Sequence, residues 1–207
     1  MPPKPKTKEE VAYERKIILD NALDIITRKG INDLSMRTLA KRCNYSATKL
    51  YYYFECKGEI ILALIEEGFK ELNLFIERTV KDISDPKEKF VTTLDAVYTF
   101  SINMDYYYNI MFGVNVPRLT DYIETPNKIF INKHLETEET NEKTFYRVFG
   151  EITNNYAKKD ELFALNIVSQ LAGIALFRSS EVLYKFNLED SKMYDVTKES
   201  IIKLIEK

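Results

Sequence analysis

Residues 35–60, SMRTLAKRCNYSATKLYYYFECKGEI, constrain the fold more than any other stretch of the chain. Ser35 and Ser46 are of the type that caps helix N-termini, and apolar side chains such as Leu39 follow the first cap at helical spacing. Residues 43–45 interrupt that pattern. The segment therefore predicts two short helices joined by a tight turn, followed by an aromatic-rich hinge and a third helix.

The second short helix carries side chains that suit contact with DNA. Hydroxyls, a cation and tyrosines lie near its N-terminus, and such groups contact phosphates and base edges. Lys49 can donate to guanine acceptors or to a phosphate, and Thr48 can contact a thymine methyl group. Tyr51 and Tyr53 point about 200° apart around a helix, so one should face DNA and the other the protein. Aromatic packing alone is the alternative explanation of the tyrosine run.

From Arg15 to Ile60, about a quarter of the chain resembles the DNA-binding domain of TetR-type repressors. The order and spacing of the matching residues carry the resemblance, because a helix-turn-helix pattern by itself is common. The matching residues, helix by helix, are Ile18, Ala22 and Gly30, then Leu34-Ser35-Met36-Arg37 and Leu39-Ala40, then Ser46, Leu50, Tyr51 and Phe54, and finally Lys57 and Glu59-Ile60.

The resemblance implies an all-α protein with two domains. Residues 1–56 would form a three-helix DNA-binding domain with a basic N-terminal arm, and residues 57–207 a helical domain for effector binding and dimerisation. Tyr51 and Lys57 would contact phosphates, and the start of the preceding helix would anchor the DNA backbone on the other side. The predicted DNA-binding residues are Ser35, Arg37, Thr38, Ser46, Ala47, Thr48, Lys49, Tyr51, Tyr52 and Lys57.

Three positions depart from the family pattern. Asn44 stands in the turn where the family has Gly, and Asn tolerates the positive φ that this position requires. Thr48 and Lys49 stand where the family has a small residue followed by Thr. Because those side chains face the groove in the family, the operator sequence cannot be taken from a relative.

The charge distribution fits a protein that contacts DNA at one end. The whole chain has a formal charge of −2, but residues 1–60 hold 12 Lys and Arg against 8 Asp and Glu, a net +4. The remaining residues hold 18 against 24, a net −6. A basic head on an acidic body is typical of such a binder, although compositional scatter could give the same numbers.

The sequence offers little support for an enzyme or a metalloprotein. His134 is the only histidine, and no phosphate-binding glycine loop or nucleophile motif is present, so we expect no catalytic residue, no metal site and no cofactor. Cys43 and Cys56 are the only cysteines, which favours free thiols in a reducing cytoplasm, with a redox switch as the sharper alternative. We expect no signal peptide and no membrane span.

Helical patterns fill most of the remaining chain. Thr7 and Glu10 predict a capping box before a helix over residues 9–29, which ends at Gly30. Further helices are predicted over residues 57–81, from Pro86 onwards, over 141–158 and 161–186, and finally to about Ile205. Short helices and turns are expected from residue 103 past Pro117 and Pro126.

An unusual number of aromatic side chains follows residue 97. Each one by itself is best explained as core, but together they could line a cavity for an apolar or aromatic ligand. The residues predicted to bind such a ligand are Tyr98, Met104, Tyr107, Met111, Phe112, Phe145, Phe149 and Phe177.

Taken together, these patterns predict a cytoplasmic regulator that binds a palindromic operator as a homodimer and is released by a small-molecule effector. By resemblance, the helices over 141–158 and 161–186 would form the dimer interface. The alternative is a helical ligand-binding or protein-interaction module without DNA binding, and an all-helical enzyme is a third possibility.

Overall fold

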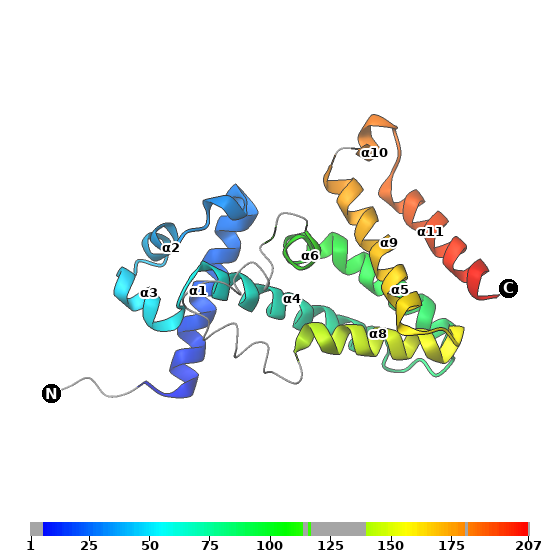
Figure 1. Cartoon of the computed structure of the whole chain (residues 1–207), viewed down its shortest axis with the longest axis horizontal. Helices are drawn as coiled ribbons and strands as arrows, with labels where there is room; N and C mark the ends of the chain where they lie inside the picture. The colour runs from blue at the N-terminus through cyan, green and yellow to red at the C-terminus, as the bar shows by residue number, and fades with distance from the viewer. Residues whose placement is uncertain (1–5, 114–115, 117–139, 181, 207) are drawn as a thin grey trace. The chain divides into compact units, whose positions relative to one another are not determined.

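The computed structural model describes residues 6–113, 116, 140–180 and 182–206, and every regular element within these ranges is a helix (Figure 1). The predicted all-α fold is confirmed. The described residues form two compact units, one up to Glu66 and the other from Glu67 to Gly113 and from Thr140 onwards. The predicted division at residue 56 coincides with the start of α4, whereas the compact units divide within that helix.

The N-terminal unit contains α1 (Lys8–Lys29), the 3-10 helix η1 (Ile31–Asp33), α2 (Met36–Arg42), α3 (Ala47–Tyr53) and the first part of α4 (Lys57–Val80). The predicted capping box at Thr7 and Glu10 starts α1, and Gly30 ends it at φ 86°. Ile18, Leu39 and Leu50, one from each of the first three α-helices, are fully buried and form the centre of a small shared core.

The turn between α2 and α3 depends on Asn44. Its φ is 56°, which confirms the left-handed conformation predicted for this position. The backbone N–H of Tyr45 donates to the Ala40 carbonyl oxygen at 2.8 Å, so the chain reverses tightly over the end of α2. Ser46 then caps α3 by accepting a hydrogen bond from the Lys49 backbone N–H.

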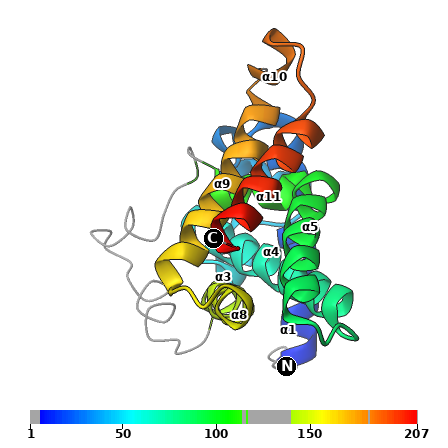
Figure 2. The same cartoon turned by 90° about the vertical axis from the view of Figure 1, so that its right-hand side faces the viewer.

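The C-terminal unit is a layered bundle of helices. It contains the later part of α4, α5 (Pro86–Asn103), α6 (Asp105–Phe112), α8 (Asn141–Ala157), α9 (Glu161–Ser179), α10 (Val182–Lys185) and α11 (Asp190–Ile205). α8 packs against α5 and α9, and α9 and α11 lie side by side (Figure 2). Asp85 caps α5 with Pro86 as its first residue, as predicted.

Close packing between α4 and α6 requires a glycine within this unit. A Cβ on Gly68 would lie 2.7 Å from the Met111 Sδ atom and 3.3 Å from a ring carbon of Tyr107. The missing side chain therefore lets α6 lie directly on α4, and it explains why Tyr107 and Met111 are buried.

The predicted helix over 161–186 was wrong at its C-terminal end. α9 stops at Ser179, and the short helix α10 follows. The hydroxyls of Ser179 and Ser180 donate to the carbonyl oxygens of Leu176 and Phe177, respectively, and such local bonds offer the backbone an alternative to the helix. Pro117, Pro126 and His134 lie outside the described residues.

Substitution of Asn44 tests the turn. Asn44→Ala should lower the free energy of unfolding by about 1–2 kcal/mol, because a Cβ without a compensating side-chain amide disfavours the left-handed conformation. Asn44→Gly should cost little, since Gly adopts positive φ freely. Urea denaturation of both variants checks the difference, and equal stability of the two would contradict the assigned conformation.

Candidate DNA-binding interface

The starts of α2 and α3 together expose most of the predicted DNA-binding residues. Both helices begin at a serine whose hydroxyl accepts a hydrogen bond from the backbone N–H three residues later, at 3.1 Å in each case. These caps fix where the first turns begin, so the neighbouring polar side chains lie on the surface. The exposed predicted residues are Ser35, Arg37, Thr38, Ser46, Ala47, Thr48, Tyr51 and Tyr52.

The three consecutive tyrosines divide between solvent and core. Tyr51 and Tyr52 are 53% and 68% exposed, whereas Tyr53 is 5% exposed. The Tyr52 ring meets the Tyr53 ring edge-on with centroids 5.0 Å apart. Tyr53 is therefore the tyrosine that faces the protein, and Tyr51 is available to a ligand of α3, as the helical geometry required.

Arg15 of α1 holds the C-terminal end of α3. Its guanidinium donates to the Tyr53 carbonyl oxygen and lies over the Phe54 ring, 3.8 Å from the centroid. A second nitrogen pairs with Glu59 of α4 at 3.0 Å. One side chain thus joins α1, the end of α3 and the start of α4.

Lys49 is only partly available to DNA in this structure. Its ammonium pairs with the Glu14 carboxylate of α1 at 3.0 Å and lies 3.4 Å from the centroid of the Tyr45 ring. Lys49 was predicted as a contact to bases or phosphates, and Glu14 was not singled out at all. No local sequence pattern could have identified Glu14, because 35 positions separate it from Lys49 in the chain.

Lys57 also makes a hydrogen bond within the protein. Its ammonium donates to the Ile31 carbonyl oxygen at 2.7 Å, and partial burial lowers the pKa of this side chain. The structure therefore places both predicted lysines in intramolecular contacts, while the exposed predicted residues around them are mostly hydroxyl-bearing.

The surroundings of Cys43 do not activate its thiol. Cys43 and Cys56 are both half-buried and free. Burial raises the pKa of the Cys43 thiol against the opposing effect of Arg42 and Lys49, which disfavours the reactive thiolate. Within the described residues, no group of three His, Cys, Asp or Glu side chains could hold a metal ion.

The residues predicted to bind a ligand do not form one site. Phe112, Phe145 and Phe149 belong to a connected set of ring contacts around Phe69. Tyr107 and Met111 pack against Gly68 instead. The others lie elsewhere in the unit: Tyr98 stacks on Tyr194 of α11 at 3.9 Å, Met104 accepts a hydrogen bond from the Tyr106 hydroxyl, and Phe177 is 41% exposed on α9.

A groove of about 810 Å³ lies between α4, α5 and α8 in the C-terminal unit. Of the predicted ligand residues, only Phe145 and Phe149 line it. Its apolar lining is completed by Ile76, Val80, Val148 and Ile152, and charged side chains also line it, namely Glu77, Lys81, Lys89, Glu151 and Lys158. Sequence reasoning missed these residues, because their helical spacing is that of ordinary core and surface positions.

Comparison with known proteins finds similarity to bacterial transcriptional regulators. A family model described as bacterial regulatory proteins, tetR family, matches residues 18–64. An uncharacterized HTH-type transcriptional regulator of Bacillus subtilis, YuxN, is 19% identical over 184 residues, which are 88% of this chain but only 60% of YuxN.

Two solved structures share the fold over nearly the whole chain. The fatty acid degradation regulator FadR from Bacillus halodurans superposes with a TM-score of 0.64 at 16% identity, covering 96% of both chains. AibR, solved in complex with isovaleryl coenzyme A and operator DNA, superposes with a TM-score of 0.58 at 17% identity, covering 89% of this chain and 95% of AibR.

The family model covers the C-terminal half of α1, all of α2 and α3, and the start of α4. These are the helices that build the exposed polar surface described above. With that match and that geometry, residues 18–64 form a helix-turn-helix domain similar to that of the tetR family of bacterial regulatory proteins.

Proposed function

We propose that the protein is a cytoplasmic repressor that binds a near-palindromic operator as a homodimer and releases it when a small effector binds. The exposed polar surface at the starts of α2 and α3 is the observation that carries the DNA-binding part. In such motifs the second helix enters the major groove, and two-fold symmetry matches half-sites about 34–36 Å apart.

The DNA contacts divide into two roles. Ser35, Arg37 and Thr38 at the start of α2, with Tyr51, would bind phosphates, whereas Thr48 and Ala47 would meet base edges. Lys57 can join the phosphate contacts without leaving the Ile31 carbonyl, because an ammonium group has three donors.

A salt-dependent gel shift with DNA that flanks the protein's own coding region tests this function. The expected result is binding that weakens steeply with salt and that mixed-sequence competitor DNA displaces only poorly. Failure to bind any fragment of that region would instead favour a ligand-binding module without DNA binding.

Substitutions in α2 and α3 should separate the two roles. Arg37→Gln should weaken binding to every duplex and flatten the slope of log K against log salt by about 0.9, the contribution of one phosphate contact. Thr48→Asn replaces the methyl group that would meet a thymine with an amide that can pair bidentately with adenine, so it should change base preference at one position of the site by about 1–3 kcal/mol. Selection from randomised duplexes checks the second effect, and an unaltered motif would remove Thr48 from the base contacts.

The homodimer is supported by the surface of α9. Leu162, Leu165 and Leu176 are exposed along one face, and the space beside Gly173 between them is open. Among the described helices, α9 alone is long and apolar enough to cross a membrane by length and composition, yet only 33% of its apolar window is buried. In a DNA-binding regulator, packing against a second copy of the same helix accounts for this surface better than a bilayer does.

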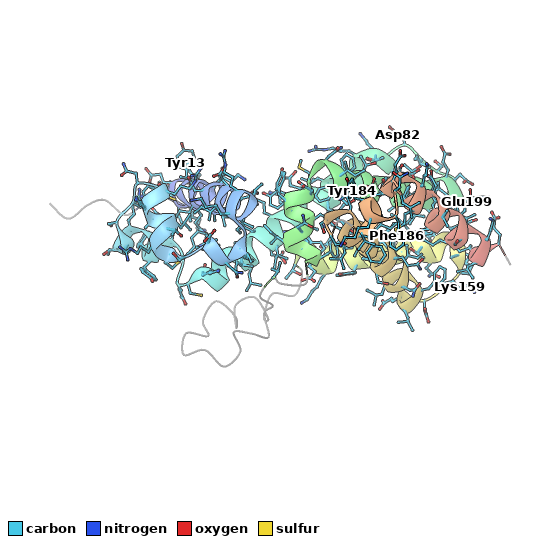
Figure 3. The ribbon with its side chains drawn as sticks, turned by 90° about the horizontal axis from the view of Figure 1, so that it is seen from above. Tyr13, Asp82, Lys159, Tyr184, Phe186 and Glu199 are labelled. Atoms are coloured by element: carbon cyan, nitrogen blue, oxygen red, sulfur yellow. The ribbon has the colours of Figure 1, made fainter. Side chains whose placement is uncertain are left out.

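The exposed apolar side chains also favour a different partner helix from the one expected. α8 carries no large exposed apolar residue. By contrast, Val196 and Leu204 are exposed on α11, which packs beside α9. Tyr184 and Phe186, labelled in Figure 3, are exposed in the segment between α9 and α11. We therefore propose α9 and α11, rather than α8 and α9, as the helices of the dimer interface.

Introducing a charge on α9 tests this interface. Leu176→Glu should produce monomers and abolish tight operator binding, because each glutamate would be buried near its symmetry copy. Ile102→Glu on α5 is a matched control, since Ile102 and Leu176 are 46% and 47% exposed. Sedimentation velocity measures the effect, and a Leu176→Glu dimer as stable as the control would exclude this face.

The groove between α4, α5 and α8 is our proposed effector site. Its apolar lining and its lysines suit an effector with an apolar body and an anionic group, and AibR was solved with such a molecule, isovaleryl coenzyme A. An effector can release DNA only if it binds the released state more tightly than the operator-bound state.

Filling the groove tests the effector site. Acyl coenzyme A thioesters of graded chain length serve as probes, and at least one should lower the operator affinity of the natural protein. Val148→Trp should remove that response while leaving operator binding intact, and Asn154→Trp, exposed on the same helix outside the groove, should retain it. A full response in Val148→Trp, measured by fluorescence anisotropy of labelled operator, would place the effector elsewhere.

A further inference from the structure

We propose that Glu14 of α1 is an internal counter-ion for Lys49 and restrains binding to DNA of unrelated sequence. The proposal rests on the proposed DNA-binding role of α3. It assigns a function to an acidic side chain at a surface where a phosphate-binding protein would be expected to carry only neutral and basic groups.

Glu14 gathers three donors from three parts of the N-terminal unit. One carboxylate oxygen pairs with the Lys49 ammonium of α3 at 3.0 Å and accepts a hydrogen bond from the Tyr45 hydroxyl in the turn. The other oxygen pairs with the ammonium of Lys6, before α1, at 3.0 Å. The Lys6 ammonium also donates to the Tyr53 hydroxyl on α3.

The carboxylate stays ionised wherever DNA binding would be measured. Hydrogen bonds from Tyr45 and Lys6, followed by the contact with Lys49, lower the pKa of Glu14 to about 2. The Glu14 side chain is 18% exposed and that of Lys49 is 37% exposed, so the pair is partly shielded from water and salt. Because the Tyr45 ring also lies against the Lys49 ammonium, the cation is held from two sides.

This arrangement changes what Lys49 can contribute to binding. A lysine that neutralises a phosphate releases a counter-ion from DNA, which strengthens binding to any sequence and makes it more sensitive to salt. A lysine that is already neutralised by a carboxylate releases none unless it leaves that carboxylate. While these pairs persist, Glu14 offsets one of the two positive charges of Lys49 and Lys6 in sequence-independent binding, and it repels nearby phosphates.

Charge neutralisation at Glu14 tests the proposal on a mixed-sequence duplex. Glu14→Gln retains an oxygen that can accept the Tyr45 hydrogen bond but removes the one negative charge that Lys49 and Lys6 share. The slope of log K against log salt should steepen by about 0.9, so the gain in affinity should be about 3-fold larger at 50 mM than at 200 mM salt. In the double variant with Lys49→Gln, this steepening should disappear.

Asp20→Asn is the matched control. Asp20 also lies on α1 and pairs with a lysine, Lys16, at 2.9 Å, but both of these side chains are about half exposed and neither is part of α3. The control raises the net charge of the head by the same amount, so it measures the general electrostatic effect. Thermal unfolding of each variant verifies that the helices remain intact.

The outcomes separate the inference from the function on which it rests. A slope change in Glu14→Gln no larger than in Asp20→Asn, or one that survives in the double variant, would overturn the counter-ion role. Weaker binding of Glu14→Gln would also overturn it, since Glu14 would then position Lys49 for DNA. If the natural protein binds its operator and these results are obtained, only the inference fails, whereas the absence of any DNA binding refutes the proposed function itself.

Discussion

The DNA-binding unit depends on holding a helix that is too short to form by itself. α3 has seven residues, and isolated helices of that length are not stable in water. Its conformation is maintained by burial of Leu50 and Tyr53 and by the cap at Ser46. Arg15 then fixes the other end through the Tyr53 carbonyl oxygen and the Phe54 ring. The orientation of every exposed side chain on α3 follows from these contacts with α1 and α2.

The same contacts determine which charges DNA can encounter. The head has an excess of cations, yet many of them are paired with acidic residues of α1 in the absence of DNA. Those pairs engage Lys6, Lys16, Arg28, Arg42 and Lys49 with Glu14, Asp20 and Asp24. The surface therefore offers hydroxyls, tyrosines and Arg37 more readily than free ammonium groups, and net charge alone overstates its attraction for phosphates.

In the C-terminal unit, the distribution of apolar side chains separates two tasks. α8 turns Phe145 and Phe149 inward, where they line the groove. α9 buries one face within the unit and leaves leucines exposed on another, which a partner surface would cover. In the regulator that we propose, the groove would serve the effector and the exposed face of α9 the dimer.

The sequence by itself determined what depends on neighbouring residues. Thr7, Gly30, Ser35, Asn44, Ser46 and Pro86 each act through the backbone within a few positions, so the caps, the left-handed turn and the helical class could be predicted from residue type. Helical geometry added that Tyr51 and Tyr53 face opposite ways, so that one of them should face DNA and the other the protein.

Only the tertiary structure decided what depends on residues far apart in the chain. It paired Glu14 with Lys49, tied Lys57 to Ile31, buried Met111 against Gly68 and left Phe177 exposed. Aromatic composition could not separate groove from core, because both need the same apolar spacing on a helix. The physical reason is that helix packing sets these distances, and helical periodicity specifies which face is apolar but not which surface will cover it.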